Sequence, residues 1–140
     1  MKRVILESPF AGNIDKNIAY ARVCIRDCLK RGEAPIASHL LFTQPGILRD
    51  EVPDERALGM RAGLVWYEVP GIYGVVYDDL GVSRGMQAGI GAALKAGASC
   101  VQRKVARETL AELPQYIINL IGALQFEAPS ITDPCPFILR

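Results

Sequence analysis

The sequence predicts an α/β protein in which a parallel sheet lies between layers of helices on both faces. Short β-favouring runs alternate along the chain with longer segments of helical periodicity, and this strand, helix, strand order is typical of parallel sheets. Glycine, proline and asparagine separate the runs, as expected for turns. With 140 residues, half of them hydrophobic, the chain can bury the core of a single domain.

The first third of the chain predicts a strand, a helix and a second strand. Residues 3–8 form a β-favouring run that ends in the turn sequence SPFAGN. Over 14–31, apolar residues recur at intervals of three and four among charged residues, which predicts an amphipathic helix that stops at Gly32. The apolar segment 33–41 predicts the second strand, and a loop rich in proline and charge follows it.

The next segment predicts a second helix. It is expected to begin at Asp54, a favourable N-cap residue, and to continue to about residue 69. Three large apolar residues of this helix are predicted to enter the core: Leu58, Leu64 and Trp66.

Two more strands and a glycine-rich helix complete the predicted sheet. Residues 71–79 predict a buried strand, a helix begins at Ser83, and 98–104 predict a fourth strand. Each glycine inside that helix costs about 1 kcal/mol relative to alanine, so its glycines indicate either close packing or a ligand against the backbone. Parallel strands in this order place a ligand crevice at their carboxyl ends.

The last third of the chain predicts an apolar helix and a tail. One apolar stripe runs along residues 110–126, formed by Leu113, Ile117, Leu120, Ile121 and Leu124. Beyond the stripe the sequence contains three prolines and ends in Phe137, Ile138, Leu139 and Arg140. Such a terminus is expected to dock on its own domain or on a neighbouring subunit, with neither favoured. We predict a homo-oligomer whose interface includes this helix.

Composition excludes several classes of partner. Sixteen basic and fifteen acidic side chains leave a formal net charge of +1, and the basic residues form no run, so we expect no nucleic-acid partner. No stretch approaches the length of a membrane span or of the apolar region of a signal peptide. We therefore expect no membrane partner and a cytoplasmic location.

The four cysteines do not indicate a disulfide framework or a metal site. Cys24, Cys28, Cys100 and Cys135 lack paired CxxC spacing, and a cytosolic chain of this length does not need disulfides. Cys24 and Cys28 could form half of a metal site, but buried packing is favoured. We expect reduced thiols, no metal and no cofactor.

The loops at the predicted crevice carry the candidate binding residues. After the first strand, small residues let backbone N–H groups approach a ligand, and this segment comprises Ser8, Pro9, Phe10, Ala11, Gly12 and Asn13. Ser83 can cap the glycine-rich helix, whose N-terminus, with Gly85 and Met86, favours a phosphate or carboxylate. Any α/β domain also needs tight turns and helix caps, so a purely structural role stays open.

Ionisable residues also fall at the ends of predicted strands. His39, the only histidine, can bind a ligand, act as a general acid near neutral pH, or anchor its loop. Glu7, Asp78 and Asp79 can bind ribose hydroxyls, take part in catalysis, or cap the following turn. Their position at the strand ends favours a functional role.

Four segments, in chain order, carry a family resemblance: VILESPFAGNIDKNIAYAR, GEAPIASHLL, ERALGMRAGL and VSRGMQAGI. They resemble small phage and bacterial proteins related to nucleoside 2-deoxyribosyltransferases, within the SLOG group of Rossmann-like nucleotide-binding domains. The resemblance covers about residues 3–104. It implies a Rossmann-like three-layer fold with four or five parallel strands, frequent dimers or larger assemblies, and a nucleoside or nucleotide pocket. We therefore divide the chain into this domain, 1–104, and a C-terminal helix and extended tail, 105–140.

The resemblance also implies a chemistry from which this sequence departs. In the deoxyribosyltransferases a glutamate on the helix after the serine-glycine turn attacks the anomeric carbon, because a carboxylate can trap an oxocarbenium-like centre. The family pattern that starts at Ser83 places Gly89 at that position. Glycine supplies no nucleophile, so we interpret this region as a binding floor with room for a larger or more anionic ligand. Glu7 or Asp79 is a candidate replacement carboxylate.

Three functional hypotheses follow. The first is a non-catalytic protein that binds a nucleotide-derived small molecule through the residues above, Gly89 included; by analogy it is a sensor or sponge of a nucleotide signal in phage-host conflict. The second is an enzyme, a nucleoside or nucleotide N-glycosidase or 2-deoxyribosyltransferase that uses a different carboxylate. The third is an assembly protein with a vestigial pocket.

Overall fold

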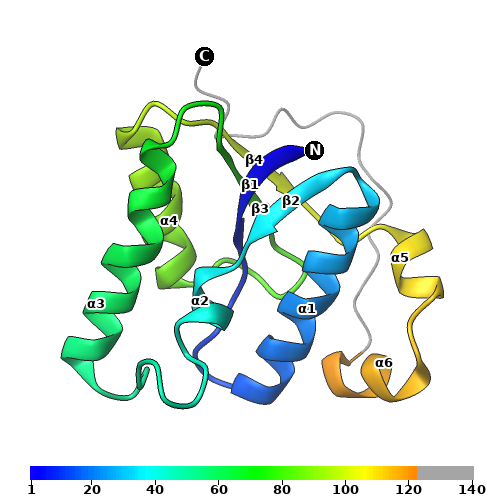
Figure 1. Ribbon diagram of the computed structural model, residues 1–140. Coiled ribbons are helices and arrows are strands. Elements are labelled where there is room, and N and C mark those ends of the chain that lie inside the picture. Colours follow the sequence, from blue (N-terminus) through cyan, green and yellow to red (C-terminus); the bar gives the residue numbers. More distant parts are fainter. Residues whose placement is uncertain (123–140) are drawn as a thin grey trace.

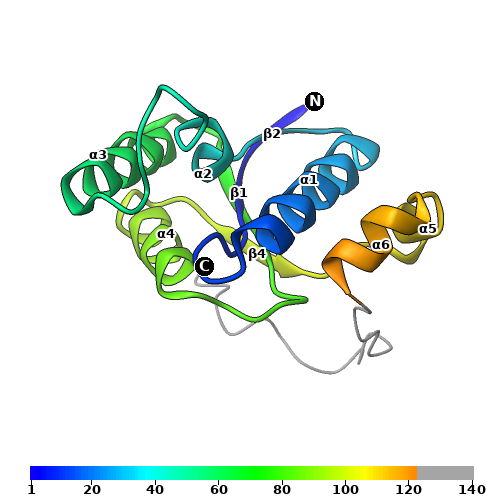
Figure 2. The same cartoon turned by 90° about the horizontal axis from the view of Figure 1, so that it is seen from below.

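The computed structural model describes residues 1–122 and contains a sheet of four parallel strands in the order β2-β1-β3-β4 (Figure 1). Its elements in chain order are β1 (Lys2–Glu7), α1 (Ile14–Lys30), β2 (Glu33–Ile36), α2 (Ser38–Leu41), α3 (Pro53–Leu64), the 3₁₀-helix η1 (Val65–Glu68), β3 (Tyr73–Tyr77), α4 (Arg84–Lys95), β4 (Cys100–Arg103), α5 (Arg107–Ala111) and α6 (Gln115–Ile121). Helices α1, α5 and α6 lie on one side of the sheet, and α3 and α4 lie on the other (Figures 1 and 2). The predicted Rossmann-like three-layer α/β class is confirmed.

The strand order produces a switch point between β1 and β3. From β1 the chain winds outward to β2, then crosses β1 to reach β3 on its other side and continues to β4. The carboxyl ends of β1 and β3 are in register, with Glu7 opposite Val76. In open parallel sheets the connections diverge at such a point, and ligands bind in the crevice between them.

Helix α1 follows the sequence pattern. Asn13 caps it by accepting a hydrogen bond from the backbone N–H of Lys16, and Gly32 follows it with φ of +75°, in the left-handed region that favours glycine. The helix buries Tyr20 and Cys24 against the sheet. This packing forms one of two hydrophobic cores.

The segment after β2 differs from the prediction. The strand ends at Ile36, and the chain then forms the helical turn α2, so His39 lies on a helix rather than at the end of a strand that continues to Leu41. The second predicted helix begins at Pro53, with Val52 rather than Asp54 at the N-cap, and tightens into η1 from Val65 onward. Proline explains this start, because its fixed φ suits the first helical position and its missing N–H is not needed there.

Helix α3 packs through glycines rather than through its large residues. A β-carbon at Gly63 would overlap the side chain of Ser38 in α2, so the two helices can approach only because position 63 is glycine. Leu58 and Trp66, predicted to lie in the core, are 49% and 43% exposed, and Leu64 is only partly buried. The prediction was wrong for Leu58 because glycines form the contact face of α3, and it was wrong for Trp66 because η1 buries Tyr67 instead.

The β3, α4 and β4 segment agrees with the prediction. Ser83 caps α4 by accepting a hydrogen bond from the backbone N–H of Met86 at 3.3 Å. Met86, Ile90 and Ala93 are buried in the second hydrophobic core, which also contains Tyr67. This core lies on the face of the sheet opposite to α1.

The C-terminal helix is interrupted. Pro114 separates α5 from α6, because proline lacks an N–H and disfavours a helical conformation in the residue before it. Ile121 of the predicted stripe is buried, whereas Leu120 remains 47% exposed. Leu124 and the tail lie outside the described residues, and the homo-oligomer stays a prediction.

Candidate functional site

A cavity of about 380 Å³ lies at the carboxyl ends of β1 and β2, between α2, α3 and the N-terminus of α4. This volume is within the range of small-molecule sites. Its lining residues include Ile5, Glu7, Ser8, Phe10, Ala11, His39, Phe42, Asp50, Arg56, Met60, Leu64, Ser83, Arg84, Gly85 and Met86. Because residues at the end of β1 and residues at the start of α4, the helix that follows β3, both line it, the cavity includes the crevice that the strand order predicts between β1 and β3.

The structure brings most, but not all, of the predicted site residues to this cavity. Those that line it are Glu7, Ser8, Phe10, Ala11, His39, Ser83, Gly85 and Met86. Those that do not are Pro9, Gly12, Asn13, Asp79 and Gly89.

The residues outside the cavity have structural contacts instead. Asp79 accepts hydrogen bonds from the hydroxyl of Tyr20 at 2.6 Å and from the backbone N–H of Val105 at 3.2 Å. Tyr20 and Val105 belong to the core on the α1 face, so Asp79 does not supply a carboxylate to the cavity as we had expected. Asn13 caps α1, and Gly12 turns the chain with φ of +96°.

Glu7 occupies the space beside Gly89. A β-carbon at position 89 would overlap the carboxyl group of Glu7, and Tyr67 of η1 donates its hydroxyl hydrogen to Oε1 of Glu7 at 2.8 Å. Gly74 in β3 makes room for this tyrosine, since a β-carbon there would lie 2.9 Å from its hydroxyl oxygen. The room that we expected for a ligand beside Gly89 is thus filled by Glu7, and two glycines create the place for the Glu7–Tyr67 pair.

Burial sets the protonation of Glu7. Removal from water raises the pKa of Glu7 to about 7, although the hydrogen bond from Tyr67 lowers it in part. A carboxyl group with this pKa exchanges a proton near neutral pH. Such a group in a cavity is a candidate functional residue on physical grounds.

Ser8 and His39 form a second polar pair in the cavity. Oγ of Ser8 and Nε2 of His39 are 2.9 Å apart, and the ring of Phe10 meets the imidazole edge to face. Burial lowers the pKa of His39 to about 4, so its ring is neutral at pH 7. The predicted role of His39 as a general acid near neutral pH is therefore not supported, but the neutral ring can exchange hydrogen bonds with Ser8 or with a ligand.

The N-terminus of α4 supplies positive potential to the same cavity. The first-turn N–H groups of a helix carry partial positive charge, and Arg84 adds a full one. At Gly85 the nearest side-chain atom to a would-be β-carbon is Oγ of Ser83, at 3.8 Å, so the backbone is uncovered on that side. This end of the cavity suits a phosphate or carboxylate group.

The remaining lining is mostly apolar. Phe42, Met60 and Leu64 supply aromatic and aliphatic surface. Asp50 and Arg56, which also line the cavity, form an ion pair at 2.5 Å. Surface of this mixed kind suits a flat heterocycle that carries a few polar groups.

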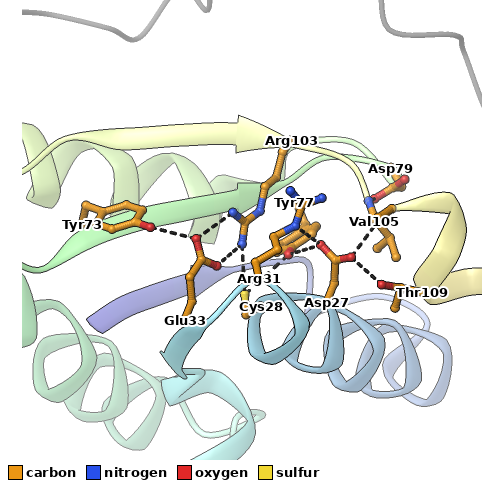
Figure 3. Close-up of polar contacts among 11 residues, drawn as sticks. Asp27, Cys28, Arg31, Glu33, Tyr73, Tyr77, Asp79, Arg103, Val105 and Thr109 are labelled. Atoms are coloured by element: carbon orange, nitrogen blue, oxygen red, sulfur yellow. Dashed lines mark hydrogen bonds and ion pairs between the residues drawn. The ribbon is translucent and has the colours of Figure 1, made fainter. Parts of the chain in front are cut away.

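A separate polar cluster lies on the α1 face of the sheet (Figure 3). Arg103 of β4 donates two hydrogen bonds to Glu33 of β2, at 3.0 and 2.5 Å, and its guanidinium lies 4.8 Å from the ring centroid of Tyr77. Tyr73 donates a third hydrogen bond to Glu33 at 2.8 Å. Burial favours the neutral form of Glu33, but Arg103 and Tyr73 outweigh it and lower the pKa of Glu33.

Asp27 extends this cluster to α5. The residue is 1% exposed and accepts hydrogen bonds from Arg31, Tyr77, Thr109 and the backbone N–H of Ala106. Burial acts to raise the pKa of Asp27, but these donors together lower it. Because these side chains are hydrogen-bonded to one another, the cluster connects α1, the sheet and α5 rather than forming a site open to a ligand.

Comparison with known families places most of the chain in one family. The family model of a domain of unknown function, DUF7768, matches residues 2–103. The chain belongs to this family. The DUF7768 match runs from β1 to the end of β4, so it includes the residues that line the cavity and ends before α5. No curated protein and no solved structure matches the chain.

The part of the chain that the structure describes offers neither a metal centre nor a membrane-spanning helix. Within residues 1–122 there is no group of three or more His, Cys, Asp or Glu side chains that could hold a metal ion. Over the same residues, no helix has both the length and the apolar character that crossing a membrane requires. Cys24, Cys28 and Cys100 are buried thiols.

Sequence reasoning missed the contribution of α3 and η1 to the DUF7768 cavity. Arg56 and Met60 of α3 line it together with Asp50 of the preceding loop, and Tyr67 of η1 donates a hydrogen bond to Glu7. Helical periodicity gives no sign that the helix tightens into a 3₁₀ turn, and this turn carries Tyr67. The available signal was Gly74, because a glycine inside a strand often marks the close approach of another group.

Proposed function

We propose that this DUF7768 domain binds a nucleoside- or nucleotide-type small molecule in the cavity at the carboxyl ends of β1 and β2. One observation carries the proposal: a single cavity combines apolar walls, the polar groups of Glu7, Ser8 and His39, and the N-terminus of α4. A nucleotide presents the matching groups, which are a flat base, a hydroxylated sugar and an anion. The resemblance to deoxyribosyltransferase-like proteins supports the same class of ligand.

Each part of such a ligand has a complementary surface. Phe10, Phe42 and Met60 offer apolar contact to a base. Glu7 and the Ser8–His39 pair can hydrogen-bond sugar hydroxyls. A phosphate suits the uncovered backbone of the first turn of α4.

Binding without turnover gives the protein a role as a sensor or as a sequestering protein. The resemblance to SLOG domains supports a nucleotide-derived signal as the ligand, and phage-host conflict as the setting. A domain that binds no member of a broad nucleotide panel would instead favour the assembly hypothesis.

The binding proposal predicts that Gly85→Leu abolishes ligand binding. A leucine at this position has room for its first atoms and extends from a residue that lines the cavity. Binding is measured by thermal shift and calorimetry against nucleosides, nucleotides and cyclic dinucleotides. A ligand at 100 times its Kd should stabilise the wild type by about 2.7 kcal/mol, and the variant should show no such shift.

Gly91→Leu is the matched control for this experiment. Gly91 lies in the same helix, no non-neighbouring atom lies within 4 Å of its would-be β-carbon, and it does not line the cavity. Both substitutions replace a helical glycine and should raise intrinsic helix stability by up to about 1 kcal/mol. Binding that survives in Gly85→Leu, or that is lost equally in Gly91→Leu, would contradict the proposed site.

A second candidate function is cleavage or transfer at an N-glycosidic bond, and the position of Glu7 favours it. Its carboxyl group lies where the side chain of residue 89 would begin, and the family resemblance aligns residue 89 with the reactive glutamate. The carboxylate would attack the anomeric carbon while the C–N bond breaks. The bonding electrons leave with the base, which gains a proton, and water or a second base then releases the sugar.

This candidate predicts loss and partial rescue of base release. Purified protein is incubated with deoxynucleosides and their monophosphates, and free base is measured by chromatography. Glu7→Ala should abolish release, whereas Glu7→Ala combined with Gly89→Glu should restore part of it, because a glutamate side chain from α4 can pass through the space that Glu7 vacates and supply a carboxylate. Wild-type protein that binds a nucleotide but releases no base would leave the binding function and eliminate the enzyme.

A further inference from the structure

An apolar groove runs between α1 and α6, on the side of the molecule away from the ligand cavity. It has a volume of about 520 Å³, and its apolar lining comes from Ile18, Ala19 and Val23 of α1 and from Leu113, Ile117 and Leu120. Leu120 is 47% exposed, and Ile18 and Ile117 are only partly buried. Packing on the sheet does not cover this groove, because α1 contacts the sheet through other side chains, such as Tyr20 and Cys24.

The described chain ends at one end of this groove. A β-carbon at Gly122 would lie 3.6 Å from Nζ of Lys16, so Gly122 lies beside the first turn of α1. Asp15 and Ile18, on either side of Lys16 in the sequence, line the groove. The chain therefore leaves α6 beside the surface in question. A segment that starts there is held at a high effective concentration relative to any separate partner.

The rest of the chain is long enough and apolar enough to cover the groove. From Asp15 to Arg26, the two ends of its α1 lining, α1 rises roughly 17 Å at 1.5 Å per residue. Residues 123–140, here named the C-terminal segment, can span up to about 60 Å when extended. The segment includes two apolar groups, one with Leu124 and Phe126 and one with Phe137, Ile138 and Leu139.

Charge offers one further contact. Arg22 of α1 lines the groove, whereas Arg26, which also lines it, pairs with Glu112 at 2.8 Å. The C-terminal segment carries Glu127 and Asp133. An acidic side chain of the segment can therefore face Arg22 while its apolar side chains enter the groove.

We propose that the C-terminal segment docks in the groove between α1 and α6 of its own chain. This contact removes apolar surface of both partners from water, which is the main driving force for such docking. The alternatives, a second copy of the chain and a free segment, are outcomes of the test.

The test uses limited chymotrypsin digestion of the full-length protein, because Leu124, Phe126, Phe137 and Leu139 are cleavage sites within the segment. Cleavage in residues 123–140 is followed by intact mass, and protein mass is followed by light scattering. We expect slow cleavage in the wild type and cleavage about tenfold faster in Leu120→Asp, which places a charge in the groove. Leu58→Asp is the matched control, since Leu58 is 49% exposed on α3, on the other side of the sheet.

Each outcome of the digestion decides the proposal. Protection that is independent of protein concentration and lost only in Leu120→Asp supports docking within one chain. Protection that appears only as dimers form assigns the groove to a second copy and overturns the proposal. A segment cut equally fast in the wild type and in Leu120→Asp overturns it too, and intact residues 1–122 in the products confirm that each variant is folded.

Discussion

Glu7→Gln is expected to stabilise the protein, and to do so far more at pH 8 than at pH 5. The folded-state pKa of Glu7 is about 7, above its ordinary value of 4.5. The folded state therefore binds the proton of Glu7 more tightly than the unfolded state does. The contribution of this proton to the free energy of unfolding is fully present below the unfolded-state pKa and is lost as the pH rises through about 7. Between pH 5 and pH 8 this loss amounts to about 2–3 kcal/mol, which glutamine avoids because it does not ionise. Urea unfolding at both pH values measures the difference.

Glu33→Gln is the matched control for this prediction. Glu33 is also a buried carboxyl, but its pKa is lowered by Arg103 and Tyr73 against the effect of burial. Its contribution is present above the unfolded-state pKa and is lost as the pH falls, so glutamine should destabilise the protein at neutral pH. Equal effects of the two substitutions, or a Glu7→Gln variant less stable than the wild type at pH 8, would contradict the assigned pKa of Glu7.

An ionised Glu7 is a cost to stability that the fold could avoid. Glutamine or leucine could occupy the space beside Gly89 without this penalty. The protein instead combines two glycines and a tyrosine to hold a carboxyl group at the edge of a cavity. A destabilising ionisable group in a cavity is characteristic of functional sites, and this supports the proposed functions that use Glu7.

The sequence was sufficient for the sheet and for helices α1 and α4. These elements have strong periodicity and clear end signals, such as Asn13 and Ser83 at the N-caps and Gly32 after α1. Helix α3 was harder to predict. Its contact face is made of Gly59 and Gly63, and a hydrophobic pattern cannot show that glycines are the buried residues while Leu58 is exposed.

The candidate site was predictable by position but not by contact. The rule that loops meet at the carboxyl ends of parallel strands correctly brought Glu7, Ser8 and His39 to one cavity. It could not distinguish Glu7 from Asp79, because both lie at the carboxyl ends of strands while their side chains point to opposite faces of the sheet. Which face a side chain takes at a strand end depends on the last residue paired, and a shift of one residue reverses it.

The buried cluster on the α1 face gives the second large expected effect. Glu33→Ala should lower the free energy of unfolding at pH 7 by about 3–5 kcal/mol, because it leaves the guanidinium of Arg103 buried without its carboxylate. The side chain of Arg103 is only 14% exposed, so water cannot replace the lost partner fully. Tyr73 also loses its acceptor. The deficit should shrink at acidic pH, since Glu33 of the wild type is then protonated too.

A double variant separates the loss of the ion pair from damage to packing. Glu33→Leu combined with Arg103→Met removes both charges and should recover most of the lost stability, because buried ion pairs can often be replaced by apolar residues at little cost. Glu112→Ala is the control on the same side of the sheet, where Glu112 pairs with Arg26 and Lys30 in solvent, and it should change stability little. Denaturant unfolding gives all three values. If Glu33→Ala costs no more than Glu112→Ala, the cluster does not tie α1 to the sheet.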